Sequence, residues 1–440
     1  MSAKRLTHRS VLTIAVPIML SNVTEPLIGV VNTTVIGQLP EAHYIGAVSA
    51  SALIFAFLFW GFGFLRLSTG GFSAQATGAK DDPELAAVFW RSFSLAIFIG
   101  VTLVLASPVI GKFAFSLIGG SQDIRRDGLS YFIYRIWSAP AALANFTILG
   151  WFVGQGRAKF ALYTQVFLNL TNMSLSAYFV LVLHLNVAGV GLAAVIAEYA
   201  AVILGLVFVA RRMRQINMRF DGLRVFDSQK LLSMLSSNGD IMIRTLCLLF
   251  AFAWFTARGA RAGDLVIASN AVLLNFFEMT AYLIDGFSYA AEALVGQAVG
   301  ARNRAQFWQA IKLTTGWAMV LGILCSGIIW LAGPTFIDFM AVNEDVRHMA
   351  RTYLGWTVLA PILSVICFQF DGIFTGAMAT RDMRNMMALS LAVYMASWWI
   401  LEPRYGNHGL WAALNIFFLA RTLTFAARLA SLEKAAFQAA

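Results

Sequence analysis

Several acidic residues stand deep inside long apolar stretches of this sequence, where a charge is difficult to explain as structure alone. Glu25, Glu198, Asp285 and Asp371 lie farthest from the ends of their stretches. A charged side chain in hydrocarbon is costly, so each is a candidate functional residue. A carboxyl that meets water on one side of a membrane and then on the other can carry a proton while a solute moves the opposite way.

One apolar stretch carries three acids in a regular pattern. Glu278, Asp285 and Glu292 are spaced by seven residues, so they project from one side of a helix with 3.6 residues per turn. We expect that side to face protein or water rather than lipid. Glu292 stands near the end of its stretch, where a carboxylate often caps a helix or forms an ion pair, so Asp285 is the stronger functional candidate.

Two of the deep acids have possible partners of opposite charge. Arg244 and Arg421 also fall within or near apolar stretches. Asp285 and Asp371 are therefore open to two interpretations, as proton-binding groups or as members of a structural ion pair with one of these arginines.

The composition predicts that lipid surrounds most of the chain. Hydrophobic residues make up 59% of the 440 residues, and charged residues make up 12%, about half of their usual share in a soluble domain. Too few polar side chains remain to cover a water-facing surface. No nucleophile with a paired base stands out, so we expect no enzyme and no catalytic residues.

The positive charge and the cysteines exclude other classes of protein. A net charge of +10 suits nucleic-acid binding in general, but most Lys and Arg stand in short connectors, as the positive-inside rule expects of a membrane protein. We therefore expect the lipid bilayer, and no nucleic acid, as a partner. The three cysteines lie in apolar stretches and the five His are scattered, so we expect no disulfide framework and no metal site.

Apolar stretches recur along the whole chain, and we predict twelve transmembrane helices in an all-α polytopic membrane protein. The first stretch continues without a small-residue cleavage site, so we expect a retained helix rather than a signal peptide. The predicted spans cover residues 11–37, 44–75, 89–112, 131–153, 160–183, 187–210, 231–257, 265–299, 307–331, 353–378, 386–401 and 409–427.

The distribution of Lys and Arg predicts the orientation and the domains. The connectors on the side of the amino terminus carry most of these residues, so we expect both termini in the cytoplasm. The longest polar connector, residues 211–230, lies in the middle of the chain. We expect it to be a cytoplasmic linker between an amino-terminal lobe, residues 1–210, and a carboxy-terminal lobe, residues 231–440.

An internal repeat supports this division into two lobes. Several segments match at one offset, close to 222 residues. The matches include Gln75-Ala76 with Gln297-Ala298, Asp123 and Arg125 with Asp345 and Arg347, and Gly150 and Gly154 with Gly372 and Gly376. Six spans in each repeat predict two pseudo-symmetric lobes around a central cavity, related by an axis along the membrane normal. Such lobes can rock and expose the cavity to either side, as a secondary transporter requires.

Long motifs of this sequence resemble those of a known family. The segment LNFFEMTAYLIDGFSYAAEALVGQAVGAR, residues 274–302, resembles the DinF branch of the multidrug and toxic compound extrusion (MATE) family, and so do PIMLSNVTEPLIGVVNTTVIGQL and DGIFTGAMATRDMRN. The resemblance implies twelve helices in two lobes and antiport of organic, often cationic and amphiphilic, compounds against protons or sodium ions. We expect a monomer in the bacterial cytoplasmic (inner) membrane, with small organic molecules as substrates and no cofactor besides the coupling ion.

Two positions depart from the family pattern. Where the first helix usually carries the Asp of a V-D-T motif, this sequence has Asn32, and where the fifth helix usually has N-x-x-x-D, it has Asn172 followed by Ser176. None of these side chains exchanges a proton near neutral pH. Asn32 is compatible with an engineered trap of one state, a natural loss of coupling, or ion binding at another site.

The remaining titratable candidates complete a hypothesis for the site. We expect Asn32, Asn172 and Ser176 to line a polar cavity in the amino-terminal lobe, while Glu25, Asp285 and Asp371 are the candidates for coupling. Glu278 and Arg244 are further candidates for the ion-coupling and substrate cavity.

The predicted function is secondary active export of organic compounds by antiport. The alternative is a flippase for lipids or lipid-linked precursors, from the related superfamily. Such a flippase tends to have a strongly cationic cavity, whereas here the acids within the spans match or outnumber the bases, which favours cationic cargo.

Overall fold

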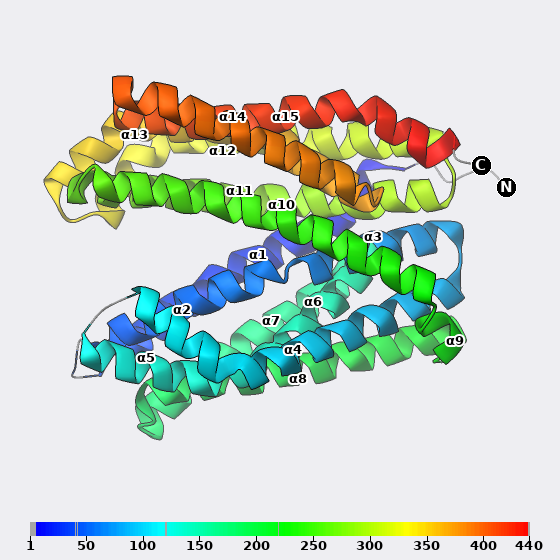
Figure 1. Ribbon diagram of the computed structural model, residues 1–440, viewed down its shortest axis with the longest axis horizontal. Helices are drawn as coiled ribbons and strands as arrows, with labels where there is room; N and C mark the ends of the chain where they lie inside the picture. Colours follow the sequence, from blue (N-terminus) through cyan, green and yellow to red (C-terminus); the bar gives the residue numbers. More distant parts are fainter. Residues whose placement is uncertain (1–5, 40, 42, 119–120, 219, 439–440) are drawn as a thin grey trace. The chain divides into compact units, whose positions relative to one another are not determined.

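The computed structural model describes residues 6–39, 41, 43–118, 121–218 and 220–438. Within these ranges every regular element is helical, which confirms the predicted all-α fold (Figure 1). The elements are α1 (His8–Ile36), α2 (His43–Gly61), α3 (Phe64–Ala79), α4 (Asp82–Ile118), α5 (Gln122–Arg135), η1 (Ile136–Ser138), α6 (Ala139–Gly154), α7 (Ala158–Ala177), η2 (Tyr178–Val182), α8 (Asn186–Gln215), α9 (Gly222–Val225), α10 (Ser228–Arg261), α11 (Asp264–Gly300), α12 (Arg304–Met340), α13 (Glu344–Gly376), α14 (Thr380–Tyr405) and α15 (Asn407–Gln438).

Eleven helical segments of the described chain are long and apolar enough to cross a membrane. The one predicted span outside these eleven, residues 386–401, corresponds to α14, which has 26 residues and is about 39 Å long at a rise of 1.5 Å per residue. Its ends carry charged residues, among them Asp382 in the first turn and Arg404 in the last. Its length therefore suits a membrane span, while its composition is more polar than that of the other eleven.

Two of the predicted spans are less regular than expected. The span at residues 44–75 is divided into α2 and α3 by a turn at Phe62 and Gly63, where glycines on both sides of Phe62 weaken the helix. The span at residues 131–153 begins earlier, at Gln122, and contains the 3₁₀ turn η1 just before Pro140. A proline has no backbone N–H to donate, so the helix is weakened in the turn that precedes it.

The described chain separates into two compact units. The first unit, which we call the C-unit, contains residues up to Met19 together with Leu235–Ala440, and the second, the N-unit, contains Leu20–Met234. The edges differ from the predicted lobes, because the start of α1 packs in the C-unit and residues 211–234 pack in the N-unit. That these units act as two moving lobes stays a prediction.

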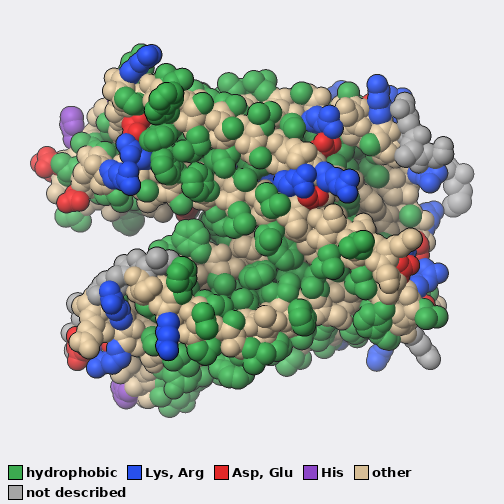
Figure 2. Space-filling view, viewed as in Figure 1, with side chains coloured by type: hydrophobic (Ala, Val, Ile, Leu, Met, Phe, Trp, Pro, Cys, Tyr) green, Lys and Arg blue, Asp and Glu red, His purple; other side chains and the backbone are tan. Residues whose placement is uncertain are grey.

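Large apolar side chains point outward along α4 and α12. Phe98 and Leu105 on α4, and Trp330 and Phe339 on α12, are between 69% and 88% exposed. Figure 2 shows hydrophobic side chains over the flanks of the helices, with most charged side chains toward the helix ends. Surfaces of this kind are unfavourable in water and suited to lipid.

Each unit has a core rich in aromatic residues. In the N-unit, Trp151 and Phe152 of α6 pack with Phe89 of α4, and the Trp151 indole donates to the carbonyl of Leu85 at 2.9 Å. In the C-unit, Trp411 of α15 is fully buried and lies edge-on to Phe255, with ring centres 4.9 Å apart. The helices α6 and α13 lie within these cores and carry the repeated glycines.

The repeated glycines perform the same packing in both units. A Cβ on Gly150 of α6 would lie 2.3 Å from the carbonyl oxygen of Arg66 on α3, and a Cβ on Gly372 of α13 would lie 2.1 Å from that of Ser288 on α11. The contacted residues, Arg66 and Ser288, are themselves 222 positions apart, as the glycines are. The internal repeat is therefore present in the helix packing as well as in the sequence.

Candidate functional site

Asp371 lies between two arginines in the C-unit. It stands on α13, and its Oδ2 atom accepts hydrogen bonds from Nη2 of Arg244 on α10 and from Nη2 of Arg421 on α15, the latter at 2.6 Å. The Arg421 side chain is fully buried, and those of Asp371 and Arg244 are 9% and 10% exposed. Three helices thus contribute one charge each to a buried cluster, with one carboxylate for two guanidiniums.

Several polar atoms of this cluster have no partner. Within the described part of the chain, Oδ1 of Asp371, Nε of Arg244, and Nε and Nη1 of Arg421 are buried without a hydrogen bond. The Arg421 guanidinium lies 5.6 Å from the ring centres of both Phe368 and Phe417, so aromatic faces supply part of its stabilisation. Buried donors without partners are expensive, so the cluster has unused capacity to bind a proton, water or a polar group.

The three acids on α11 differ in exposure, although they share one side of the helix as predicted. Glu292 is fully buried, Asp285 is intermediate, and Glu278 is exposed. Asp285 acts electrostatically on Arg421, which associates it with the cluster around Asp371. Glu278 opens instead onto a groove between α10 and α11.

The amides predicted for the amino-terminal lobe are buried in the N-unit. Asn32 on α1 is 8% exposed, and its Oδ1 atom has no hydrogen-bond partner among the described residues. Asn172 and Ser176 on α7 are also buried, with the Ser176 hydroxyl 3.5 Å from Oδ1 of Asn172. Glu25 lies on α1, but its side chain is outside the described part of the structure.

The structure adds polar residues that the sequence analysis did not single out. Asn169 on α7 donates to the Thr24 hydroxyl on α1 at 2.6 Å, and its own Oδ1 accepts from Gln165 at 3.1 Å. This bond places α7 against α1, the helix of Asn32. Gln165, Asn169, Asn172 and Ser176 follow one another at steps of four, three and four residues, and this helical spacing is the signal that would have revealed the stripe.

Glu198, one of the deep acids, has an amide partner in the N-unit. Asn145 on α6 donates to Oε2 of Glu198 on α8 at 2.7 Å and to its backbone carbonyl at 3.2 Å. An amide donor stabilises a carboxylate in a poorly solvated place without neutralising its charge. The N-unit therefore keeps an acid within a span, away from the positions where the family pattern expects one.

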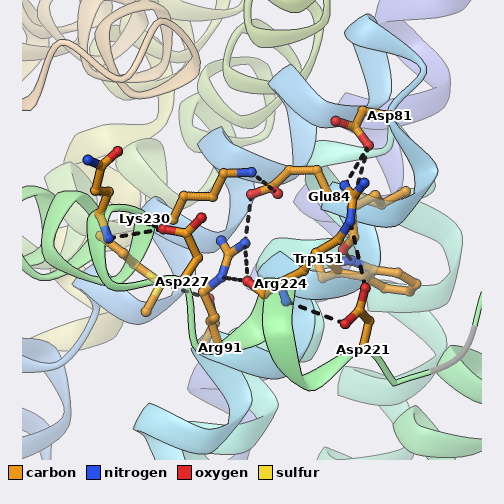
Figure 3. Close-up of polar contacts among 12 residues, drawn as sticks. Asp81, Glu84, Arg91, Trp151, Asp221, Arg224, Asp227 and Lys230 are labelled. Atoms are coloured by element: carbon orange, nitrogen blue, oxygen red, sulfur yellow. Dashed lines mark hydrogen bonds and ion pairs between the residues drawn. The ribbon is translucent and has the colours of Figure 1, made fainter.

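The predicted linker is attached to the start of α4 in the N-unit (Figure 3). Arg91 of α4 is 4% exposed and donates to the carbonyl oxygen of Arg224 at 3.1 Å and to Glu84 at 2.9 Å. Lys230 forms a second ion pair with Glu84. We call these residues the linker clasp, and they hold α9 and the start of α10 against α4.

Asp227 completes the linker next to the clasp. Its Oδ1 atom accepts from the backbone N–H groups of Lys230 at 3.1 Å and Gln229 at 3.0 Å, in the first turn of α10. The hydrogen bond from the Lys230 N–H is the largest of the effects that lower the pKa of this carboxyl. The carboxylate is thus the form that caps the helix.

Comparison with known proteins identifies the family. The MatE family model matches residues 17–178 and 241–399, more than half of the chain. This chain belongs to the MatE family. The match covers parts of both predicted lobes, in agreement with the repeat.

Individual relatives of this MatE protein support the same family assignment. DNA damage-inducible protein F of Escherichia coli (strain K12) is 38% identical, over 97% of this chain and 92% of the relative. Multidrug export protein MepA of Staphylococcus aureus (strain MSSA476) is 20% identical, over 93% of this chain and 91% of its own. A solved structure described as the outward-facing conformation of a multidrug resistance MATE family transporter has a TM-score of 0.87 at 17% identity, covering 97% of both chains.

These findings confirm the predicted resemblance to the MATE family and to its DinF branch. The protein is a multi-pass membrane transporter and not an enzyme, and its family needs no cofactor. In the described residues no group of three or more His, Cys, Asp or Glu side chains is arranged to hold a metal ion. The roles of the individual site residues stay predictions.

Proposed function

We propose that this MatE protein is a secondary active exporter, which moves organic amphiphilic compounds out of the cytoplasm in exchange for protons or sodium ions. The related MepA is named a multidrug export protein, and the solved structure is described as a multidrug resistance transporter. With a bacterial relative at 38% identity, we place the chain in the inner membrane, with both termini in the cytoplasm and a monomer as the working unit.

The coupling site in this proposal lies in the C-unit. Asn32, Asn172 and Ser176 cannot exchange protons near neutral pH, and we assign them to a polar cavity of the amino-terminal lobe. The observation that carries the proposal is the arrangement at Asp371, where one oxygen holds two guanidiniums and the other oxygen is buried without a partner.

A change of charge at this cluster would have mechanical consequences. A proton or cation at the unpartnered oxygen would weaken the bonds to Arg244 on α10 and Arg421 on α15, so the packing of these helices would respond to ion binding. We include Asp285 and Glu25 as further coupling candidates, because both are acids within spans.

The same two arginines favour one alternative function. Two buried guanidiniums for one carboxylate at Asp371 form a region that attracts anions, as a flippase for lipids or lipid-linked precursors requires for its headgroups. A fluorescent anionic lipid that crosses proteoliposome membranes with this protein, with no response to organic cations, would establish the alternative.

Drug-driven proton release from proteoliposomes tests the main proposal. The unchanged protein is compared with Asn32→Asp and Asp371→Asn, and the proton release of each is divided by the amount of monodisperse protein. We expect Asp371→Asn to abolish coupling and Asn32→Asp to increase it, and separate proton and sodium gradients identify the ion. Full coupling after simultaneous removal of Glu25, Asp285 and Asp371 would show that the assigned acids are not the coupling groups.

A further inference from the structure

A groove in the C-unit lies outside the charge cluster around Asp371. It is formed between α10 and α11 and has a volume of about 220 Å³. The residues that line it and enter the argument are Phe255, Thr256, Asn270, Leu274, Asn275 and Glu278.

The inner wall of the groove is fixed by hydrogen bonds to α15. Asn270 is 3% exposed, donates to Oδ1 of Asn407 at 2.9 Å and accepts from Asn407 at 2.9 Å and from the Trp411 indole at 2.8 Å. Phe255 is fully buried behind the same wall. A groove with such a wall is formed before any ligand enters, which lowers the entropic cost of binding.

Part of the donor capacity that lines the groove is already used within the protein. The Asn275 amide donates to the carbonyl of Ala271 at 3.0 Å, and the Thr256 hydroxyl donates to that of Phe252 at 3.0 Å, while the Asn270 amide donates to Asn407. The acceptors left for a ligand are Oδ1 of Asn275, the lone pairs of Thr256 and the Glu278 carboxylate, and they outnumber the one N–H that the Asn275 amide keeps. Such a lining matches a ligand that brings its own N–H donors.

Glu278 supplies a negative charge to the groove. It is exposed, and within the described part of the chain no hydrogen bond or ion pair engages it. Arg258, a cation near the end of α10, does not neutralise Glu278, because its guanidinium is paired with Glu402 at 3.0 Å and lies over the ring of Trp398. An unpaired carboxylate within a membrane-spanning helix is costly unless a cation or water accompanies it.

We propose that this groove binds the protonated amino group of a lipophilic amine, with Glu278 as counter-charge and Asn275 and Thr256 as additional acceptors. Leu274 and Ile267 provide apolar surface for the attached hydrocarbon. The volume is below the usual range of about 300–1,000 Å³ for a drug site, so the groove receives an ammonium head and one ring system. The inference rests on the proposed export of organic compounds and assigns a contact site to it.

Direct binding tests the groove. Naphthylmethylamine is titrated into the full-length protein in phosphatidylcholine nanodiscs and followed by its fluorescence anisotropy, with the neutral naphthylmethanol and the anionic naphthoate as matched ligands. We expect the amine to bind more tightly than both. Glu278→Gln should weaken amine binding about tenfold, the factor that corresponds to about 1.4 kcal/mol. Glu278→Asp, which keeps the charge, should bind the amine more tightly than Glu278→Gln does.

Asp264→Asn is the matched control, because Asp264 is an exposed carboxylate on the same helix but outside the groove. It should leave amine binding within about twofold of the natural protein. Unchanged amine binding in Glu278→Gln, with protein of the same monodispersity, would overturn the proposal. Equal binding of the amine and naphthylmethanol would also overturn it, because the groove would then be an apolar lipid site.

Different outcomes would contradict the amine-binding groove and the proposed export function. Transport of naphthylmethylamine is measured separately in proteoliposomes. Amine binding that depends on Glu278, without any transport by the natural protein, would contradict export and leave the groove intact. Transport that is indifferent to Glu278→Gln, together with unchanged binding, would contradict the groove alone.

Discussion

The charge cluster of the C-unit shows how much can depend on a single carboxylate. Asp371 is the acceptor for both Arg244 and Arg421, and all three side chains are at most 10% exposed. Removing one partner of a buried ion pair leaves an uncompensated charge, which usually costs about 3–5 kcal/mol. Here the removal of one carboxylate leaves two such charges.

We therefore expect Asp371→Asn to lower the free energy of unfolding by at least about 3 kcal/mol. Thermal unfolding in detergent micelles, followed by near-ultraviolet circular dichroism, measures the change. The matched control is Asp338→Asn, which breaks the pair with Arg351 at 2.6 Å, where both side chains are at least 40% exposed. That change should cost less than about 1 kcal/mol. Similar losses for the two variants would mean that the guanidiniums at Asp371 are solvated by other groups.

The sequence predicted the members of this cluster but not its arrangement. Hydrophobic context marked Asp371, Arg244 and Arg421 as unusual, because charges within spans need partners. The pairs join residues 127 and 50 positions apart on three helices, and residue types alone left Arg244 and Arg421 as alternatives. Only the packing shows that one carboxylate oxygen holds both.

At the level of helices, the close contact of α13 with α11 depends on the absence of a side chain. A Cβ on Gly372 would lie 2.1 Å from the carbonyl oxygen of Ser288, and one on Gly376 would lie 2.4 Å from that of Glu292. Both atoms belong to a helix backbone, so neither can move without displacing the helix. Small residues allow this approach in membrane proteins, where helix packing depends on van der Waals contact.

Gly372→Ala should therefore destabilise the protein by about 1–3 kcal/mol, the usual cost of overpacking a core. Gly150→Ala should have a similar effect, because its Cβ would lie 2.3 Å from the Arg66 carbonyl oxygen. Gly316→Ala in α12 provides the contrast, since nothing lies within 4 Å of its Cβ position and alanine is the better helix former. The thermal unfolding midpoints of the three variants are measured in one detergent. A decrease in the midpoint of Gly316→Ala as large as that of Gly372→Ala would refute the packing argument.

The linker is an element whose stability should depend on pH. The pKa of Asp227 is lowered from its ordinary value of 3.8 by the Lys230 and Gln229 amides. A lowered folded-state pKa means that the carboxylate stabilises α10 above pH 3.8 and that this stabilisation is lost as the pH falls through the folded-state value. We expect the amides of the first turn of α10 to lose hydrogen-exchange protection in that acidic range, after correction for intrinsic rates.

Asp227→Asn is the control for this pH effect. Asparagine is also a good N-cap, but it does not titrate. The variant should show protection of the first turn that does not change over the same acidic range. The same acid-induced loss in the natural protein and in Asp227→Asn would assign the effect to another group, such as Glu84 in the linker clasp.

Over the whole molecule, the repeat is more regular in the backbone than in the residue types. α4 and α12 begin 222 positions apart and also end 222 positions apart. Asp81 accepts from the amide of Glu84 at the start of α4, and Asn303 accepts from the amide of Gln306 at the start of α12. Asp and Asn are both good helix caps, so the two halves keep the cap while the residue differs.

This regularity explains which parts of the fold the sequence predicted. Membrane spans and the repeat follow from hydrophobic length and from matches such as Gly150 with Gly372, which can be found in the residues. The break between α2 and α3 and the grouping of the start of α1 with the C-unit depend on tertiary packing, which has no local signal. The sequence marked Glu278 as a candidate, but its groove depends on Asn270 and its partners on α15, which only the structure brings together.

Left-handed backbone positions allow a test of the repeat in both units at once. Lys80 has a φ of 56° and Arg302 has a φ of 50°, and each is exposed just after the end of a helix, α3 or α11. A residue with a Cβ loses about 1–2 kcal/mol in this conformation, while glycine adopts it freely but has more entropy to lose on folding. Lys80→Gly and Arg302→Gly should therefore each raise the free energy of unfolding by about 0.5–1 kcal/mol. The control is Lys312→Gly, within α12 and also exposed, which removes the same charge as Lys80→Gly but should lower the free energy of unfolding by about 1 kcal/mol. Chemical unfolding in micelles measures the three changes. A change of the same sign in all three variants would contradict a left-handed backbone conformation shared by the two halves.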